Sequence, residues 1–136
     1  MASFQAGDIL EIVCSHPTLG EFRFSPKANE SFTFDPGGVR TNDDASQITG
    51  NGQGIYQKNR VRWSIEGPIA VDFTSGNEME NLPKLAESSE EGVWTISHIS
   101  GNIWKGKGIV VGDLQPDTNA ATMTLKVSGS GKLEKL

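Results

Sequence analysis

Apolar and polar residues alternate along several short segments of this chain, and this period of two residues limits what the chain can fold into. Successive side chains of a β-strand point to opposite faces, so alternation places one face on a core and the other in water. The pattern covers residues 9–14, 61–66, 69–73, 94–98, 103–111 and 122–127. Residues 22–24 and 32–34, each with two Phe side chains on one face, are predicted to form the arms of a hairpin around a turn-like segment.

One segment has a helical pattern instead. Met79, Leu82 and Leu85 fall on one face of a helix over about residues 76–88, and Ser75 followed by Glu78 has the spacing of a capping box. An interior proline kinks a helix, so a later start with Pro83 in the first turn is the alternative. The chain is therefore predicted to be mainly β, a single domain over residues 1–136 with a two-sheet β-sandwich or barrel-like fold, one flanking α-helix and a long loop.

The long loop is predicted over residues 36–57. Glycine-rich segments at 36–38 and 50–54 surround a polar stretch at 41–47, and no alternation is visible between them. Connections of this length are uncommon in compact domains and are usually functional or disordered. We expect the segment to be ordered only when a partner holds it.

Charge and cysteine content exclude several function classes. The chain of 136 residues has 17 acidic and 12 basic residues and a net charge of −5, so it lacks the basic balance of a protein that grips phosphates tightly. Its single cysteine, Cys14, excludes a disulfide framework and a cysteine-rich zinc site. No apolar run suits a membrane span and residues 1–5 do not resemble a signal peptide, which predicts a soluble protein made in the cytoplasm without membrane anchoring.

Three motifs suggest chemistry, and each has a simpler interpretation. Residues 101–107 match G-x-x-x-x-G-K, but Gly108 and a strand-like segment follow where a phosphate-binding loop needs Ser or Thr and a helix, which favours a glycine-rich hairpin. The glycines of residues 50–54 lack the strand and helix that frame a dinucleotide site. Cys14 and His16 would share a strand face, so a thiolate–imidazole pair is conceivable, although a lone strand cysteine is more often a buried hydrophobe.

No catalytic residue, cofactor or metal site is predicted, and the chain is not expected to be an enzyme. His16 and His98 are the only histidines and have no ligand-like spacing, while the carboxylates of residues 78–80 and 87–91 suit a solvated helix and its exit. Trp63, Trp94 and Trp104 lie in alternating segments, which favours core packing over a sugar-binding platform. A β-sandwich module that binds carbohydrate or protein is the main alternative to a structural protein, and a small hydrolase is the third.

The last third of the chain carries a family resemblance. Residues 106–114, 118–127 and 130–134 resemble the closing hairpin of bacteriophage tail tube proteins, a fold shared with the tube proteins of contractile injection and type VI secretion machines. The order of a first strand, a long polar loop, a mid-chain helix and two long strands is similar to that family over nearly the whole chain.

The resemblance implies a virion protein with two roughly orthogonal sheets, six copies per ring, and stacked rings that form the channel for DNA delivery into the host. Assembly would occur in the host cytoplasm. The implied partners are further copies of the chain, tape-measure and tail terminator proteins, baseplate or tail-tip proteins, and a sheath if the tail contracts. DNA would pass transiently without specific binding, because an acidic wall opposes the phosphate contacts that give affinity.

Two groups of residues are predicted to serve this assembly. In the family a long loop or arm over this region reaches the neighbouring ring, so the predicted inter-ring or other oligomer contacts of this chain are Arg40, Asn42, Asp43, Asp44, Gln47 and Tyr56. The predicted lumen-facing residues are Glu11, Arg62, Glu66, Lys105, Thr122 and Thr124.

Overall fold

Ten strands and one helix form from residues 3–136, the part of the chain that the computed structural model describes. Met1 and Ala2, which belong to the segment compared with a signal peptide, lie outside the described residues. The elements are β1 (Ile9–His16), β2 (Gly20–Phe24), β3 (Thr33–Asp35), β4 (Gly38–Ile48), β5 (Gly54–Val61), β6 (Trp63–Ala70), α1 (Asn77–Glu87), β7 (Gly92–His98), β8 (Ile103–Val111), β9 (Thr122–Gly129) and β10 (Glu134–Lys135).

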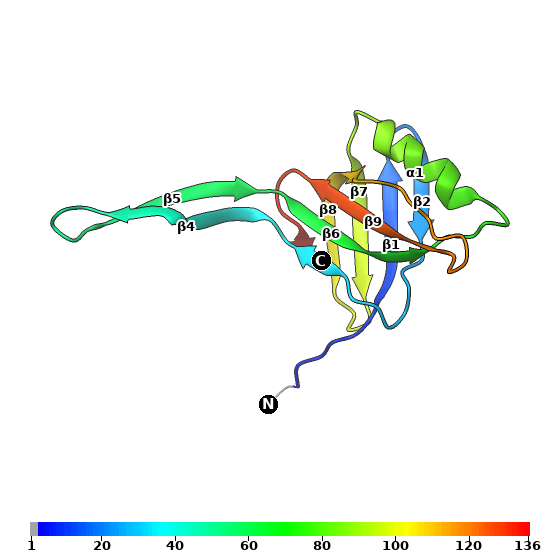
Figure 1. Cartoon of the computed structure of the whole chain (residues 1–136), viewed down its shortest axis with the longest axis horizontal. Coiled ribbons are helices and arrows are strands. Elements are labelled where there is room, and N and C mark those ends of the chain that lie inside the picture. Colours follow the sequence, from blue (N-terminus) through cyan, green and yellow to red (C-terminus); the bar gives the residue numbers. More distant parts are fainter. Residues whose placement is uncertain (1–2) are drawn as a thin grey trace.

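Eight of the strands form one folded sheet. Their order is β2-β1-β7-β8-β9-β6-β3, and β10 pairs with β8 outside this path. The first part of β8 pairs with β7 and its last three residues pair with β9, so β8 belongs to both halves of the sheet. Figure 1 shows β6 and β9 crossing over β1 and β7. The end strands β2 and β3 do not pair, so the sheet is not closed into a barrel, and the predicted mainly β, sandwich-like fold with one helix is confirmed.

Glycines and two indoles shape the place where β8 passes from one half to the other. A Cβ atom on Gly129 would overlap the Lys107 carbonyl oxygen, and one on Gly108 would lie 2.7 Å from the Trp63 ring. Trp63 Nε1 donates a hydrogen bond of 2.8 Å to the Lys107 carbonyl, and Trp94 Nε1 donates one of 3.0 Å to the Gly108 carbonyl. The glycine-rich hairpin predicted in place of a phosphate-binding loop is confirmed, because β7 and β8 pair antiparallel through these residues.

The core lies between the two halves. Trp63 and Trp94 are 0% and 1% exposed, which confirms their predicted packing, whereas Trp104 is half-buried against Phe34. The alternation of β6 and β9 is also confirmed, since every second residue of each strand is buried along most of its length. The other fully buried side chains are Ile12, Cys14, Ile65, Ile69, Val71, Leu82, Ile96, Leu125 and Val127. Each large apolar side chain buried in this way contributes about 1.5–3 kcal/mol.

The predicted hairpin between residues 22–24 and 32–34 is wrong. β2 pairs with β1, where Phe24 lies opposite Ile12, and β3 pairs with β6, where Phe34 lies opposite Ile65. The two short strands therefore lie at opposite ends of the sheet order. Each aromatic strand gains more by adding to a long, half-buried strand than by pairing with another short one.

The helix begins and ends near the predicted positions but starts differently. The N-cap position is Gly76, with φ of 67° and no side-chain cap, and Glu78 accepts a hydrogen bond of 3.2 Å from the Asp72 backbone N–H. The predicted capping box is therefore wrong, as is the later start, because Pro83 lies inside the helix. Buried Leu82 and Leu85 hold this helix on the body, since packing supplies most helical stability in proteins.

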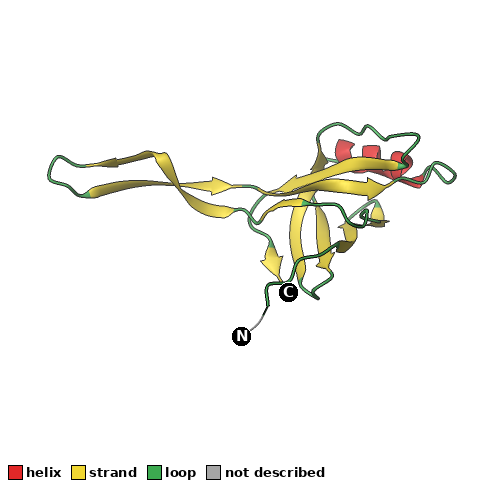
Figure 2. Cartoon of the chain, turned by 60° about the horizontal axis from the view of Figure 1, so that its bottom comes forward, coloured by secondary structure: helices red, strands yellow, loops and turns green. Residues whose placement is uncertain are grey.

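Of the long loop or arm predicted at residues 36–57, the structure shows the arm, with most of the segment in paired strands. β4 and β5 pair antiparallel and form a long hairpin that projects from the rest of the molecule (Figures 1 and 2). We call residues 38–61 the arm and the remaining described residues the body. Polar residues cover both faces of much of the arm, so its strands lack the alternation by which the body strands are recognised.

Candidate assembly interface

The arm is a regular hairpin at its root and irregular further out. Pairing runs from Gly38 opposite Val61 to Asn42 opposite Gln57, and it resumes with Gln47 opposite Ile55. Four residues of β4, 43–46, therefore lie opposite a single residue of β5. Such bulges bend and twist a strand pair. At the tip, the Thr49 N–H donates to the Gln53 carbonyl at 2.7 Å and closes the turn.

Large apolar side chains on the arm are in water. Val39, Ile48, Ile55 and Tyr56 are 64%, 68%, 51% and 71% exposed. A two-stranded hairpin without a covering layer has little stability of its own in water. Ile48, Ile55 and Tyr56 lie near the tip, where Gln47 pairs with Ile55 and Ile48 with Gly54, while Val39 lies near the root. The arm is therefore the candidate interface of this molecule.

Cross-strand register divides the arm into two faces. Val39 lies opposite Arg60 and Thr41 opposite Lys58, so these residues share one face, which Tyr56 continues along β5. The Tyr56 ring lies over Gly54, where a Cβ atom would come within 2.7 Å of the ring. This face combines apolar groups with cations, a composition suited to contact with a partly acidic protein surface.

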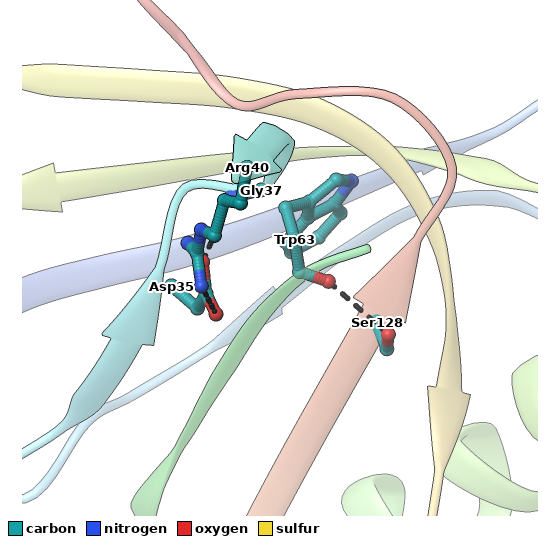
Figure 3. Close-up of polar contacts among 5 residues, drawn as sticks. All are labelled: Asp35, Gly37, Arg40, Trp63 and Ser128. Atoms are coloured by element: carbon teal, nitrogen blue, oxygen red, sulfur yellow. Dashed lines mark hydrogen bonds and ion pairs between the residues drawn. The ribbon is translucent and has the colours of Figure 1, made fainter. Parts of the chain in front are cut away.

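The root of the arm is fixed to the body (Figure 3). The Asp35 carboxylate accepts a hydrogen bond of 2.9 Å from the Gly37 N–H and forms an ion pair with Arg40. Hydrogen bonds from Arg40 and then from Gly37 lower the pKa of Asp35 below its usual value. Gly37 has φ of 72°, and a Cβ atom there would lie 2.6 Å from the backbone nitrogen of Trp63. The arm therefore leaves the body through a tightly packed turn at a defined place.

All six residues predicted as inter-ring contacts lie on the arm. Arg40 is engaged by Asp35 at the root, while the Asn42 side chain accepts a hydrogen bond of 3.1 Å from the Ala45 N–H inside the bulge. The others are Asp43 and Asp44 in the bulge, Gln47 opposite Ile55, and exposed Tyr56. Sequence reasoning missed the exposed apolar residues Val39, Ile48 and Ile55. Their isolation in a polar, glycine-flanked segment was the available signal.

The predicted lumen-facing residues do not share one surface. Glu66, Thr122 and Thr124 lie on the outward face of the β6–β9 pair, and Arg62 directly precedes β6. Glu11 and Lys105 lie on β1 and β8 in the other half of the sheet, where Glu11 pairs with Arg23 at 2.8 Å.

Cys14 and His16 do not form the thiolate–imidazole pair that their spacing made conceivable. Cys14 is fully buried, and burial raises the pKa of its thiol to about 11, whereas nucleophilic cysteines have lowered values. His16 forms a hydrogen bond of 2.8 Å with Ser88 and accepts one of 3.1 Å from the Leu19 N–H. Within residues 3–136, no three His, Cys, Asp or Glu side chains are placed to hold a metal ion.

One hollow of about 440 Å³ lies beside the N-terminal segment of the body. Phe34 and Trp104, with ring centroids 5.2 Å apart, and His98 line part of it. His98 Nε2 lies 3.2 Å from the Gly7 carbonyl oxygen, and Asp8 accepts a hydrogen bond of 2.9 Å from the Asn29 N–H. These hydrogen bonds hold the N-terminal segment against the rest of the body.

Comparison with known proteins yields a distant structural likeness. No protein-family model and no curated protein matches the chain. Among helices within residues 3–136, none combines the length and apolar character needed to cross a membrane. The chain is similar to a chain in the six-fold-symmetrised cryo-EM structure of the anti-feeding prophage (AFP) baseplate, with 15% identity, coverage of 99% of this chain and 97% of that chain, and a TM-score of 0.46. At this similarity, the likeness does not assign a function to this chain.

Proposed function

We propose that this chain is a structural subunit of a phage-tail-like particle, which assembles with identical copies into hexameric rings stacked as a tail tube. The observation that carries the proposal is the arm, an exposed hairpin with apolar residues on it and a fixed root. The order of elements that resembles tail tube proteins supports the same function. Tape-measure, tail terminator, baseplate or tail-tip proteins, and a sheath in a contractile tail, are the further partners.

The arm is ordered before assembly. Its backbone is already paired, so a neighbouring copy would bury the exposed side chains without ordering a long loop, which lowers the entropic cost of association. Apolar area removed from water contributes about 25 cal/mol per Å², so even a modest contact repeated around a closed ring is stabilising. Closure also gives each exposed strand edge a partner.

A sugar-binding module is less well supported. Its binding platform would need exposed aromatic rings, but Trp63 and Trp94 are buried and Trp104 packs on Phe34. The exposed aromatic residues of the body, Phe4, Phe34 and Phe73, lie on separate segments.

The test is assembly of the purified chain, followed by negative-stain electron microscopy and by light scattering over a concentration series. In the shortened variant, Asn-Gly replaces residues 42–57 between Thr41 and Lys58, which are directly opposite and suit a two-residue turn. The matched control replaces only residues 49–53 with Asn-Gly and keeps both strands. We expect six-fold rings or tubes from the natural chain and the control, and monomers from the shortened variant.

Circular dichroism separates assembly from folding, because the shortened variant should keep the thermal transition of the body. Monomers of the natural chain at every concentration, with and without a tail-initiating complex as template, would contradict the proposal. If the shortened variant assembled at the same protein concentration as the natural chain, the arm would not be needed for assembly.

A further inference from the structure

The basic side chains of this molecule fall into two groups. Of the twelve Lys and Arg residues, five form ion pairs: Arg23, Lys27, Arg40, Lys84 and Lys126. The other seven form none with any carboxylate of the described residues. All seven lie on β5, directly before β6, on β8, or in the C-terminal segment that packs at the arm root. Most of the cations without ion pairs therefore lie near the arm root, while Lys58 lies further out on the arm.

Two adjoining hollows mark this place. Arg60, Arg62 and Lys132 line the first hollow, beside the arm root, and Lys105 and Lys107 line the second together with Lys132. We call these five residues the cationic end. Glu134 also lines the second hollow, and Glu91 nearby accepts hydrogen bonds from Ser130. Five cations against these two carboxylates leave a net positive surface on a chain that is negative overall.

An acidic surface lies at the opposite end of the body. Asp72, Glu78 and Asp117 form the acidic end. Glu78 accepts a hydrogen bond from the Asp72 N–H, and the segments of Asp72 and Asp117 are joined because the Val71 N–H donates to the Ala121 carbonyl at 2.7 Å. Asp72 and Asp117 are exposed and accept hydrogen bonds from backbone N–H groups of their own turns, which lower the pKa of both carboxyls.

The two ends are separated by the length of one strand pair. Trp63 lies opposite Gly129 next to the cationic end, and Ala70 lies opposite Thr122 next to the acidic end. Seven steps along a strand correspond to roughly 23 Å. The Debye length at physiological salt is about 8 Å, so the two ends do not neutralise each other within one copy. In Figure 1 the arm and the start of α1 likewise lie on opposite sides of the body.

We propose that the cationic end of one copy docks on the acidic end of the next copy, head to tail. The inference rests on the proposed function and names the surfaces through which the copies meet. A second copy fits better than nucleic acid, because each chain carries a matching anionic surface and its net charge of −5 repels phosphates. Unlike surfaces that meet in this way propagate into rings or filaments, whereas a two-fold dimer needs the same surface on both copies.

Carbodiimide cross-linking of assembled protein tests the contact, because this reagent joins a lysine amine directly to a carboxylate that touches it. The assembly is made from equal parts of ¹⁴N and ¹⁵N chains, so mass spectrometry distinguishes links between copies. We expect mixed-isotope links from Lys132 or Lys107 to Asp72, Glu78 or Asp117. The Glu80–Lys84 pair, 3.6 Å apart within one helix, is the internal control for the reaction.

Matched variants test the energetics. Arg62→Gln with Lys132→Gln should raise the protein concentration needed for assembly by about tenfold or more at physiological salt, as should Asp72→Asn with Asp117→Asn, which keeps the turn acceptors. Lys27→Gln with Lys84→Gln removes the same charge elsewhere and should leave assembly unchanged.

The outcomes separate the two proposals. Rings or tubes without these cross-links, or with no dependence on these charges, would overturn the head-to-tail contact and leave the proposed function standing. A natural chain that never assembles would overturn both. Loss of binding to a DNA oligonucleotide in the Arg62→Gln, Lys132→Gln variant, with assembly intact, would assign the cationic end to nucleic acid instead.

Discussion

Two antiparallel strand pairs in this molecule have similar backbones and different surroundings. In the β6–β9 pair, one face is buried in the core and the other is exposed. The β4–β5 arm has almost all of its side chains exposed on both faces. Both satisfy their backbone groups by pairing, but only the first pair gains from removing apolar area from water. Pairing thus sets the shape of a hairpin, while burial determines how much it contributes to folding.

The largest effect is expected for Trp63→Ala, which removes a buried side chain from the β6–β9 pair. Loss of the ring and of its hydrogen bond to the Lys107 carbonyl should lower the free energy of unfolding by about 3–5 kcal/mol. Tyr56→Ala on the arm should lower it by less than about 0.5 kcal/mol. Denaturant unfolding of monomeric protein measures both. Equal losses would show that the arm belongs to the cooperative folding unit.

Gly129→Ala should have the next largest effect. The added Cβ atom would overlap the Lys107 carbonyl oxygen at the crossing between the sheet halves, and such overpacking costs about 1–3 kcal/mol. Gly50→Ala at the arm tip is the control, because its Cβ atom would have no neighbour within 4 Å. Thermal melts of the two variants should differ clearly. A normal melting temperature for Gly129→Ala would mean that the crossing adjusts without cost.

At the arm root, Asp35→Asn should change pH dependence. The folded-state pKa of Asp35 lies below its usual 3.8, so its stabilising effect is present above that value and is lost as pH falls through the folded-state pKa. The Gly37 amide signal in an NMR titration should therefore move in acid in the natural chain and stay constant in the variant. If both proteins titrate alike, another carboxyl controls the root.

The smallest effect is expected for Lys84→Met on the outer face of α1. Its ion pair with Glu80 spans one helical turn and is largely exposed, and such pairs contribute about 0.3–0.5 kcal/mol. This variant tests whether exposure, rather than position in the body or the arm, determines the effect. Substitution of an exposed body residue should lower the free energy of unfolding as little as substitution of an arm residue. A double-mutant cycle with Glu80→Gln measures the pair. A coupling energy above about 1 kcal/mol would show that burial is not what separates strong from weak contributions in this fold.

The sequence predicts the body better than the arm for the same reason. Strands with one buried face leave an alternating pattern, so β6 and β9 could be recognised, while β4 and β5 have no buried face and resemble a loop in sequence. The pairing partners of the strands were less predictable. Nothing in the local sequence shows that β2 pairs with β1 rather than with β3. The capping-box prediction was wrong because the Glu78 carboxylate accepts its hydrogen bond from the Asp72 N–H instead.

The candidate interface was predictable as a region and less so in its residues. The length and glycine content of residues 36–57 singled out the arm, but polar residues were favoured as contacts over exposed Val39, Ile48 and Ile55. The cationic end could not be predicted, because it joins residues from β5, β8 and the C-terminal segment that are far apart in the sequence.

Cys14 makes this molecule convenient for site-specific labelling. The only thiol of the chain is fully buried, and with a pKa of about 11 it carries almost no thiolate at neutral pH, so maleimide reagents should leave the folded protein unmodified. A cysteine placed at Gly50, where the arm tip is open, would then be the single reactive position. Fluorophores attached there would report distances between neighbouring arm tips as subunits associate, with the native thiol left in place.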